Sequence, residues 1–254
     1  MGLTWATAGI FPRATGAEAM RWFRTTRRTS TGTGATGSGR LSGAERDPAR
    51  LVTFSDAVFA IAVTLLILQI RPPQDTRDLL HGLTSLWPSY LAYAVTFLLI
   101  GQMWVNHHVM FDHIRAVDRL VLFLNTVLLM VIAFLPFASS VLAAAFESGH
   151  GRQSAVVFYG IAFEAVAALF NVIWEYVRRG RHLLQQAVDT DDLSAIGRRY
   201  RLALVWIAVG TALGILHPVA GVVVIAAFIP AYWLPIGGEA SSAGRVRDRG
   251  PTPP

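Results

Sequence analysis

Two groups of polar side chains interrupt the apolar runs of this 254-residue chain, and they are the groups best placed to do chemistry. Ser55 and Asp56 stand near the start of one apolar run, and Trp104, Asn106 and His107 stand near the end of the next. A charged side chain inside a membrane span is costly, so it is by default a paired structural group or a functional one. Three roles follow for the Asp56 carboxylate: a structural hydrogen-bonded contact, a contact that changes on gating, or a proton relay or catalytic pair. We favour the structural contact.

The same residues argue against a metal centre or a cofactor site. His107 and His108 are adjacent, so their side chains point about 100° apart on a helix, whereas metal-binding histidine pairs usually stand four residues apart. The chain has no cysteine, which removes thiolate ligands and thiol catalysis. We find no nucleophile and base pair at a usable depth. No metal, cofactor or enzymatic activity is therefore predicted.

The composition places these groups in a membrane protein. Hydrophobic residues make up 53% of the chain and charged residues only 15%, against about 25% charged in ordinary soluble proteins. All 22 basic residues are arginines, and they occur in a few clusters. An all-α integral membrane protein in a lipid bilayer is expected, and nucleic acid is not expected as a partner.

Six apolar runs are long enough to be membrane spans, since a span needs about 20 residues. Residues 1–49 are predicted to be a disordered, arginine-rich arm without a removable signal peptide, residues 50–237 the six-helix domain, and residues 238–254 a disordered tail. A long run without Asp, Glu or Arg is divided by a turn at His217 and Pro218. The predicted spans are Val52–Ile70, Leu86–Val109, Leu120–Phe146, Ala155–Val177, Leu202–Leu216 (extending back to Tyr200) and Val219–Ile236.

The arginines also predict the orientation of the chain. With six spans, nineteen arginines fall on the side that holds both termini and three fall on the other side. Because positively charged loops stay in the cytoplasm, both termini are expected to be cytoplasmic in a multi-pass protein of the plasma membrane. The arginines of the arm and tail would lie beside anionic lipid headgroups.

The first span carries an aliphatic stripe turned away from Asp56. At 100° per residue from Asp56, Leu68 lies at about 120°, Ile61 at about 140° and Leu65 at about 180°, with Thr64 at about 80°. If Asp56 faces the second span, the stripe faces either lipid or copies of itself around a symmetry axis. In the second case, rings of aliphatic side chains form a constriction that gates ion flow by dewetting.

The motif that opens the first span is Arg50-xxx-Phe54-Ser55-Asp56, followed by AVFAIAVTLLILQI, and the next span carries Trp104-xx-His107-His108. This pattern resembles the transmembrane protein 175 family, the lysosomal potassium channels and their prokaryotic homologues. The resemblance covers about residues 50–237. It implies a homotetramer whose first helices line a central pore that potassium ions cross.

The resemblance also implies roles for individual residues. Ile61 matches the gate position, Leu65 and Leu68 match further constrictions, and Thr64 matches a position linked to potassium preference. The matching structural hydrogen-bond network comprises Arg50, Ser55, Asp56, Trp104, Asn106 and His107. Ala57 follows the signature where many prokaryotic members have glycine, a minor departure.

The predicted function is a modestly potassium-selective cation channel with a hydrophobic gate. The chain lacks a TVGYG-type filter loop, so selectivity would have to come from dehydration at the aliphatic ring, offset in part by Thr64 hydroxyls. The alternative is a proton- or cation-coupled secondary transporter that uses Asp56 and His107, which calls for broken helices near a midplane site. Pro136 and Pro230, the candidate breaks, are distant from Asp56 in sequence.

Overall fold

The computed structural model describes residues 48–73, 77–185 and 190–233. The predicted arm, apart from Pro48 and Ala49, lies outside these ranges, as do the predicted tail and the last residues of the predicted sixth span. Within these ranges the fold is all-α, and one isolated bridge joins Ile114 to Leu184. The predicted fold class is confirmed.

Five of the helices are long and apolar enough to cross a membrane, and a sixth apolar helix, α8, is shorter with 16 residues. These six correspond to the six predicted apolar runs. A seven-residue helix, α3, and the short 3-10 turn η1 were not predicted. The elements, in chain order, are α2 (Ala49–Ile67), α3 (Leu79–Ser85), α4 (Trp87–Asp112), α5 (Arg119–Ser148), α6 (Arg152–Arg179), η1 (Arg181–Leu183), α7 (Thr190–Leu216) and α8 (Pro218–Trp233).

Local side-chain chemistry accounts for several of the helix ends. The Asp118 carboxylate accepts from the backbone N–H of Val121 at 2.8 Å, which caps the start of α5. Gly149 has a φ of 76°, the left-handed conformation that glycine adopts readily, and it ends α5. The predicted turn at His217 is confirmed, because α7 ends at Leu216 and α8 begins at Pro218.

Two predicted boundaries were wrong. The first span was expected to reach Ile70, but α2 ends at Ile67, and tighter turns follow in which the N–H of Leu68 donates to the carbonyl of Leu65 at 3.2 Å. The fifth span was expected to begin near Tyr200, but α7 begins at Thr190. Apolarity marks where a helix enters the hydrocarbon, whereas a helix continues through arginine-rich sequence, since arginine is a good helix former.

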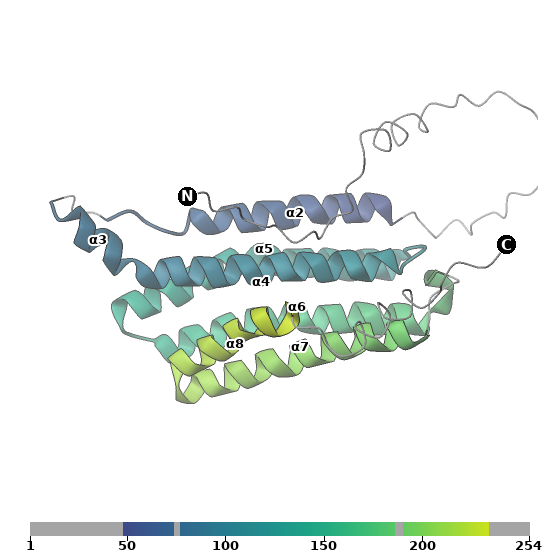
Figure 1. Ribbon diagram of the computed structural model, residues 1–254. Helices are drawn as coiled ribbons and strands as arrows, with labels where there is room; N and C mark the ends of the chain where they lie inside the picture. Colours follow the sequence, from purple (N-terminus) through teal and green to yellow (C-terminus); the bar gives the residue numbers. More distant parts are fainter. Residues whose placement is uncertain (1–47, 74–76, 186–189, 234–254) are drawn as a thin grey trace, which may run out of the picture. The chain divides into compact units, whose positions relative to one another are not determined.

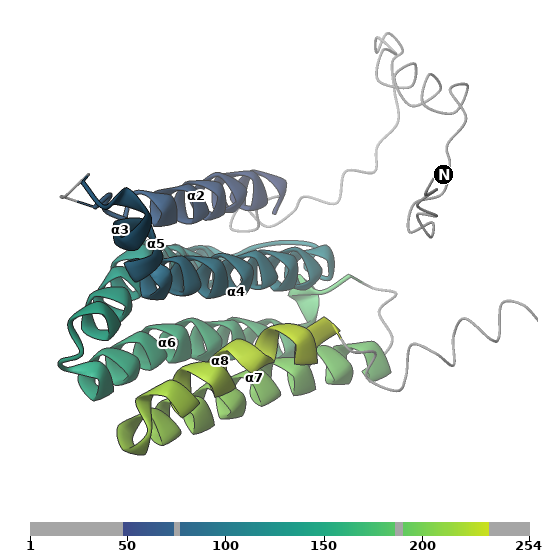
Figure 2. The same ribbon diagram turned by 60° about the vertical axis from the view of Figure 1, so that its left-hand side comes forward.

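The helices run up and down through one bundle (Figures 1 and 2). Helices α2, α4 and α5 pack on one another, α5 also packs on α6, and α6, α7 and α8 form the rest of the bundle. The core between α5 and α6 includes the fully buried side chains of Leu128, Leu135, Tyr159 and Phe163. Helix α5 therefore connects the two groups of helices.

Helices α7 and α8 approach each other backbone to backbone. A Cβ added to Gly221 would lie 2.5 Å from the Cα of Gly214, a distance that real Cβ atoms do not adopt. Only glycine fits at this crossing, which closes the hairpin that begins at His217.

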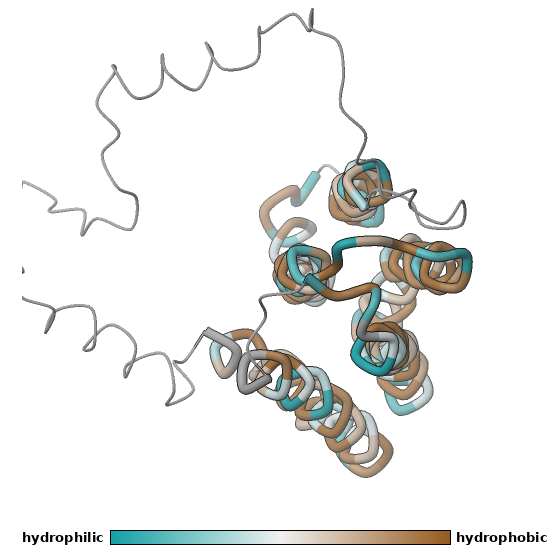
Figure 3. The backbone as a smooth tube through the Cα atoms, turned by 90° about the vertical axis from the view of Figure 1, so that its right-hand side faces the viewer, coloured by the Kyte–Doolittle hydropathy of each residue, from teal (hydrophilic) through white to brown (hydrophobic). Residues whose placement is uncertain are grey.

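Hydrophilic residues gather at the ends of the helices, and the right-hand side of Figure 1, which faces the viewer in Figure 3, holds most of the described arginines. The start of α2, the loop between α4 and α5, the end of α6 and the start of α7 all lie there. We call this the arginine-rich end. Arg71, Arg77 and Arg152 lie at the opposite end, as the six-span topology requires.

Candidate functional site

The carboxylate of Asp56 meets the side chains of α4 at the arginine-rich end. The indole Nε1 of Trp104 donates to Oδ1 of Asp56 at 2.9 Å, and Nδ1 of His108 lies 3.7 Å from the same oxygen. The rings of Trp104 and His108 contact each other at a tilt of 49°, with their centroids 4.8 Å apart. The Asp56 side chain keeps 40% of its surface exposed. This contact therefore lies at the edge of the helix bundle.

A second, fully buried set of hydrogen bonds joins three helices. The amide Nδ2 of Asn125 in α5 donates to Oγ of Ser55 in α2 at 3.1 Å, and Oγ of Ser55 donates to the carbonyl of Leu51 at 2.9 Å. The Oδ1 atom of Asn125 lies 3.0 Å from Nε2 of His107 in α4. Because an amide oxygen only accepts, the His107 Nε2 carries the proton. We call this set the Ser55–Asn125–His107 chain.

Apolar packing encloses this chain. Ser55, His107 and Asn125 are each 0% exposed, and the His107 imidazole contacts the rings of Phe59 and Phe111. A buried polar group that loses its partner costs about 1–3 kcal/mol. The three side chains therefore specify how α2, α4 and α5 fit together.

The structure does not gather all the predicted network residues into one cluster. His107 bonds to Asn125, not to Asp56, and the carbonyl of Asn106 accepts from the Tyr200 hydroxyl at 3.1 Å, on the side of α4 that faces α7. Arg50 is exposed in the first turn of α2 and forms no salt bridge with a residue that the structure describes.

The rotation of α2 explains this division. Its buried residues are Ser55, Phe59, Ala62 and Leu66, so Ser55 faces the bundle and Asp56, about 100° around the helix, stands at the margin. From the sequence, we considered a buried face of α2 centred on Asp56. The observed buried face lies about a quarter turn away from that position.

The aliphatic stripe of α2 faces out of the helix bundle. Ile61, Leu65 and Leu68 are 58%, 39% and 72% exposed, so the described part of the chain leaves them largely uncovered. Leu68 caps the helix instead of lying within it. The exposed Thr64 side chain donates from Oγ1 to the carbonyl of Ile61 at 2.8 Å, which leaves the hydroxyl oxygen available as an acceptor.

Asn125 is the site residue that the sequence reasoning missed. It stands six residues after Arg119 in a helix that begins at the arginine-rich end, which places it at a depth similar to Ser55, six residues after Ala49 in α2. This similar depth could have identified Asn125 as a candidate partner of Ser55. A second buried polar cluster was also missed: the Thr96 hydroxyl donates to Oγ of Ser139 at 3.0 Å and lies 2.9 Å from the Tyr159 hydroxyl.

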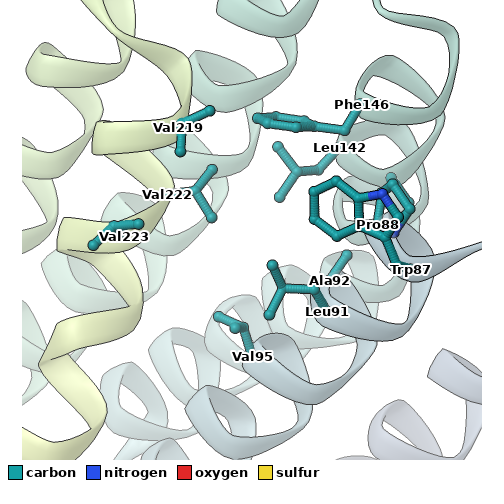
Figure 4. A pocket seen from close by; sticks show the side chains of 11 residues that line it. Trp87, Pro88, Leu91, Ala92, Val95, Leu142, Phe146, Val219, Val222 and Val223 are labelled. Carbon is teal, nitrogen blue, oxygen red and sulfur yellow. The ribbon is translucent and has the colours of Figure 1, made fainter.

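Two other features bear on what the site can do. Within the described ranges, no group of three or more His, Cys, Asp or Glu side chains could hold a metal ion. A pocket between α4, α5 and α8, at the end opposite the arginine-rich end, is lined by aliphatic and aromatic side chains that include Leu91, Leu142, Phe146 and Val222 (Figure 4). Its lining offers ions almost no polar ligand.

Comparisons with known proteins agree with this geometry. Residues 50–136 match the family model described as endosomal/lysosomal potassium channel TMEM175. A potassium channel of Streptomyces collinus is 41% identical over 155 residues, which cover 60% of this chain and 75% of the relative. A potassium channel of Chamaesiphon minutus is 40% identical over 161 residues, covering 62% and 79%. The crystal structure of a lysosomal potassium-selective channel TMEM175 homolog from Chamaesiphon minutus superposes with a TM-score of 0.66 at 34% identity, covering 72% of this chain and 95% of that one.

The membrane-spanning helices and the comparisons together define a multi-pass membrane protein of the cation channel class. The chain belongs to the TMEM175 family. It is a channel-family protein and not an enzyme, and the family does not support the alternative of a secondary transporter centred on Asp56 and His107.

The Ser55–Asn125–His107 chain gives the first prediction. Asn125→Ala removes both of its hydrogen bonds and leaves the buried His107 Nε2 without a partner, while Ser55 keeps its bond to the carbonyl of Leu51, so we expect a loss of about 1–3 kcal/mol of stability. Thermal unfolding of the purified protein in detergent measures it. Thr126→Ala is the control, because the exposed Thr126 hydroxyl bonds only to the carbonyl of Leu122. Equal melting temperatures for the two variants would contradict a structural role for the chain.

Proposed function

We propose that the protein forms a homotetrameric, modestly potassium-selective channel in the plasma membrane, with both termini in the cytoplasm and four copies of α2 around the pore. The observation that carries this proposal is the exposed stripe of Ile61, Leu65 and Leu68 on a helix whose buried face, about 120° around, is held in the bundle by a buried hydrogen-bond chain. The naming of two relatives as potassium channels supports the choice of ion.

The need for several copies follows from the single pore helix of each chain, and the number four is what the family resemblance implies. One subunit contributes one helix with this stripe, and a single helix cannot enclose a pore. Four copies of α2 around an axis enclose one, and the narrow buried face of α2 keeps each copy attached to its own subunit. The broad outward face is then available for contacts around the axis.

The gate in this proposal is a ring of aliphatic side chains. Seven residues separate Ile61 from Leu68, about 10 Å along a helix, so three rings stack along the pore. Such rings expel water when narrow and conduct when wide enough to hydrate. Potassium gives up hydration water more readily than sodium because its charge is spread over a larger ion. The Thr64 hydroxyl oxygens offset part of the lost hydration.

The test of this function is the reversal potential of purified protein in planar bilayers under opposed potassium and sodium gradients. We expect single-channel steps and a reversal potential displaced toward the potassium equilibrium potential. A pH gradient across the same bilayer measures proton permeation. Saturable flux without steps would overturn the channel proposal.

The gate predicts the effect of a polar substitution. Ile61→Asn wets the constriction, so we expect the single-channel conductance or the open probability to rise severalfold. Ile67→Asn is the matched control: Ile67 is an exposed isoleucine of α2, 51% exposed, but lies about 120° away around the helix from Ile61. Equal effects of the two variants on the current would place the Ile61 stripe against lipid.

Thr64 predicts a change in selectivity. Thr64→Ala removes the hydroxyl oxygen that would contact dehydrated potassium, so the potassium over sodium permeability ratio should fall. The control is Thr53→Ala, since the Thr53 hydroxyl makes the same kind of bond within α2, to the carbonyl of Ala49 at 2.9 Å. An unaltered reversal potential in Thr64→Ala would remove this residue from the selectivity mechanism.

A further inference from the structure

A pocket between α6 and α7 at the arginine-rich end is separate from the α2 stripe and from the Asp56 contact. The residues of its lining that matter here are Trp174, Glu175, Arg178 and Arg179 of α6 and Gly197 and Arg201 of α7. Figures 1 and 2 show these two helices side by side at this end.

Two hydrogen-bond donors converge in this pocket without an acceptor. Trp174 is only 2% exposed, and its indole Nε1 is buried with no hydrogen-bond partner. A Cβ at Gly197 would lie 3.2 Å from this nitrogen and 3.4 Å from Nη1 of Arg201, so both donors lie close against this glycine in the pocket lining. An indole N–H and a guanidinium can only donate. The pocket wall at Gly197 therefore presents donors and suits an acceptor.

The charges of the pocket favour an anion. Glu175 accepts from Nε and Nη2 of Arg178 at 2.9 and 2.8 Å and from Nε of Arg179 at 2.8 Å. Arg201 forms no salt bridge with any residue in the described ranges. Three guanidinium groups thus face one carboxylate, which leaves an excess of positive charge around the buried indole.

We propose that this pocket binds a phosphate group. A phosphate presents several acceptor oxygens, which match the planar forks of arginine better than a single carboxylate does. It can accept from the Trp174 N–H and from Arg201 at once, while Arg178 and Arg179 supply the surrounding positive charge. The phosphate comes from a lipid headgroup of the leaflet at this end or from a soluble phosphate compound, and the chemistry of recognition is shared.

The test uses the full-length protein in detergent, titrated in separate experiments with phosphatidylglycerol, phosphatidylcholine and inorganic pyrophosphate at constant ionic strength. Affinity is measured from the concentration dependence of the melting temperature, since a ligand that binds the folded state raises it. Binding of phosphatidylglycerol alone would identify a lipid headgroup site, and binding of pyrophosphate alone would identify a soluble phosphate site.

Three variants change the affinity for whichever probe binds. Trp174→Phe keeps the ring and removes the N–H, and we expect affinity to fall about tenfold, the value of one charge-assisted hydrogen bond. Arg201→Gln should weaken binding at least as much. Glu175→Gln removes the competing carboxylate and should strengthen binding, an effect that a damaged fold would not produce.

The control is Arg119→Gln, which removes an exposed arginine at the same end but outside the pocket. Its affinity should match that of the wild type. Equal weakening in Arg119→Gln and Arg201→Gln would show unspecific attraction to the arginine-rich end and overturn the proposal. Absence of binding by the wild type, or wild-type affinity in both Trp174→Phe and Arg201→Gln, would overturn it too.

Discussion

The Ser55–Asn125–His107 chain is the constraint on which the placement of α2 depends. In a bilayer, apolar side chains gain little by leaving lipid for one another, so helix association relies on close packing and hydrogen bonds. Helix α2 has few buried residues, and Ser55 is the polar one among them. Its bond to Asn125 selects which side of α2 faces the bundle. The exposure of the aliphatic stripe is the direct result of that selection.

Much of this arrangement could be predicted from the sequence. The length of the apolar runs predicts the membrane spans, and the distribution of arginines among the loops predicts which helix ends lie on the same side. The pairing of Asp56 with the second span rested on equal depth alone, and the structure brings Asp56 to Trp104. The depth of a polar side chain in the membrane does not determine which polar side chain of the next helix it bonds to. That pairing depends on the rotation of each helix about its axis. A face of α2 centred on Asp56 therefore differs by about a quarter turn from the observed buried face, which is centred near Ser55.

The residues that escaped prediction are those whose role exists only in three dimensions. Asn125 stands in a long apolar run without a motif around it, and only its contacts with Ser55 and His107 reveal its importance. From the sequence, Trp174 resembles any aromatic residue near a membrane surface. Only the structure shows that its indole N–H is buried without a hydrogen-bond partner. The roles given to the stripe and to Thr64 stay predictions until currents are measured.

The small buried face of α2 has a consequence for how such a protein can change. Four buried residues hold the helix against the rest of the bundle, and none of them belongs to the stripe: Ser55, Phe59, Ala62 and Leu66. Substitutions on the outward face therefore leave the buried hydrogen bonds and packing of α2 intact. In the proposed channel this outward face lines the pore, so descendants of this chain could acquire new conduction properties one residue at a time while keeping the same fold.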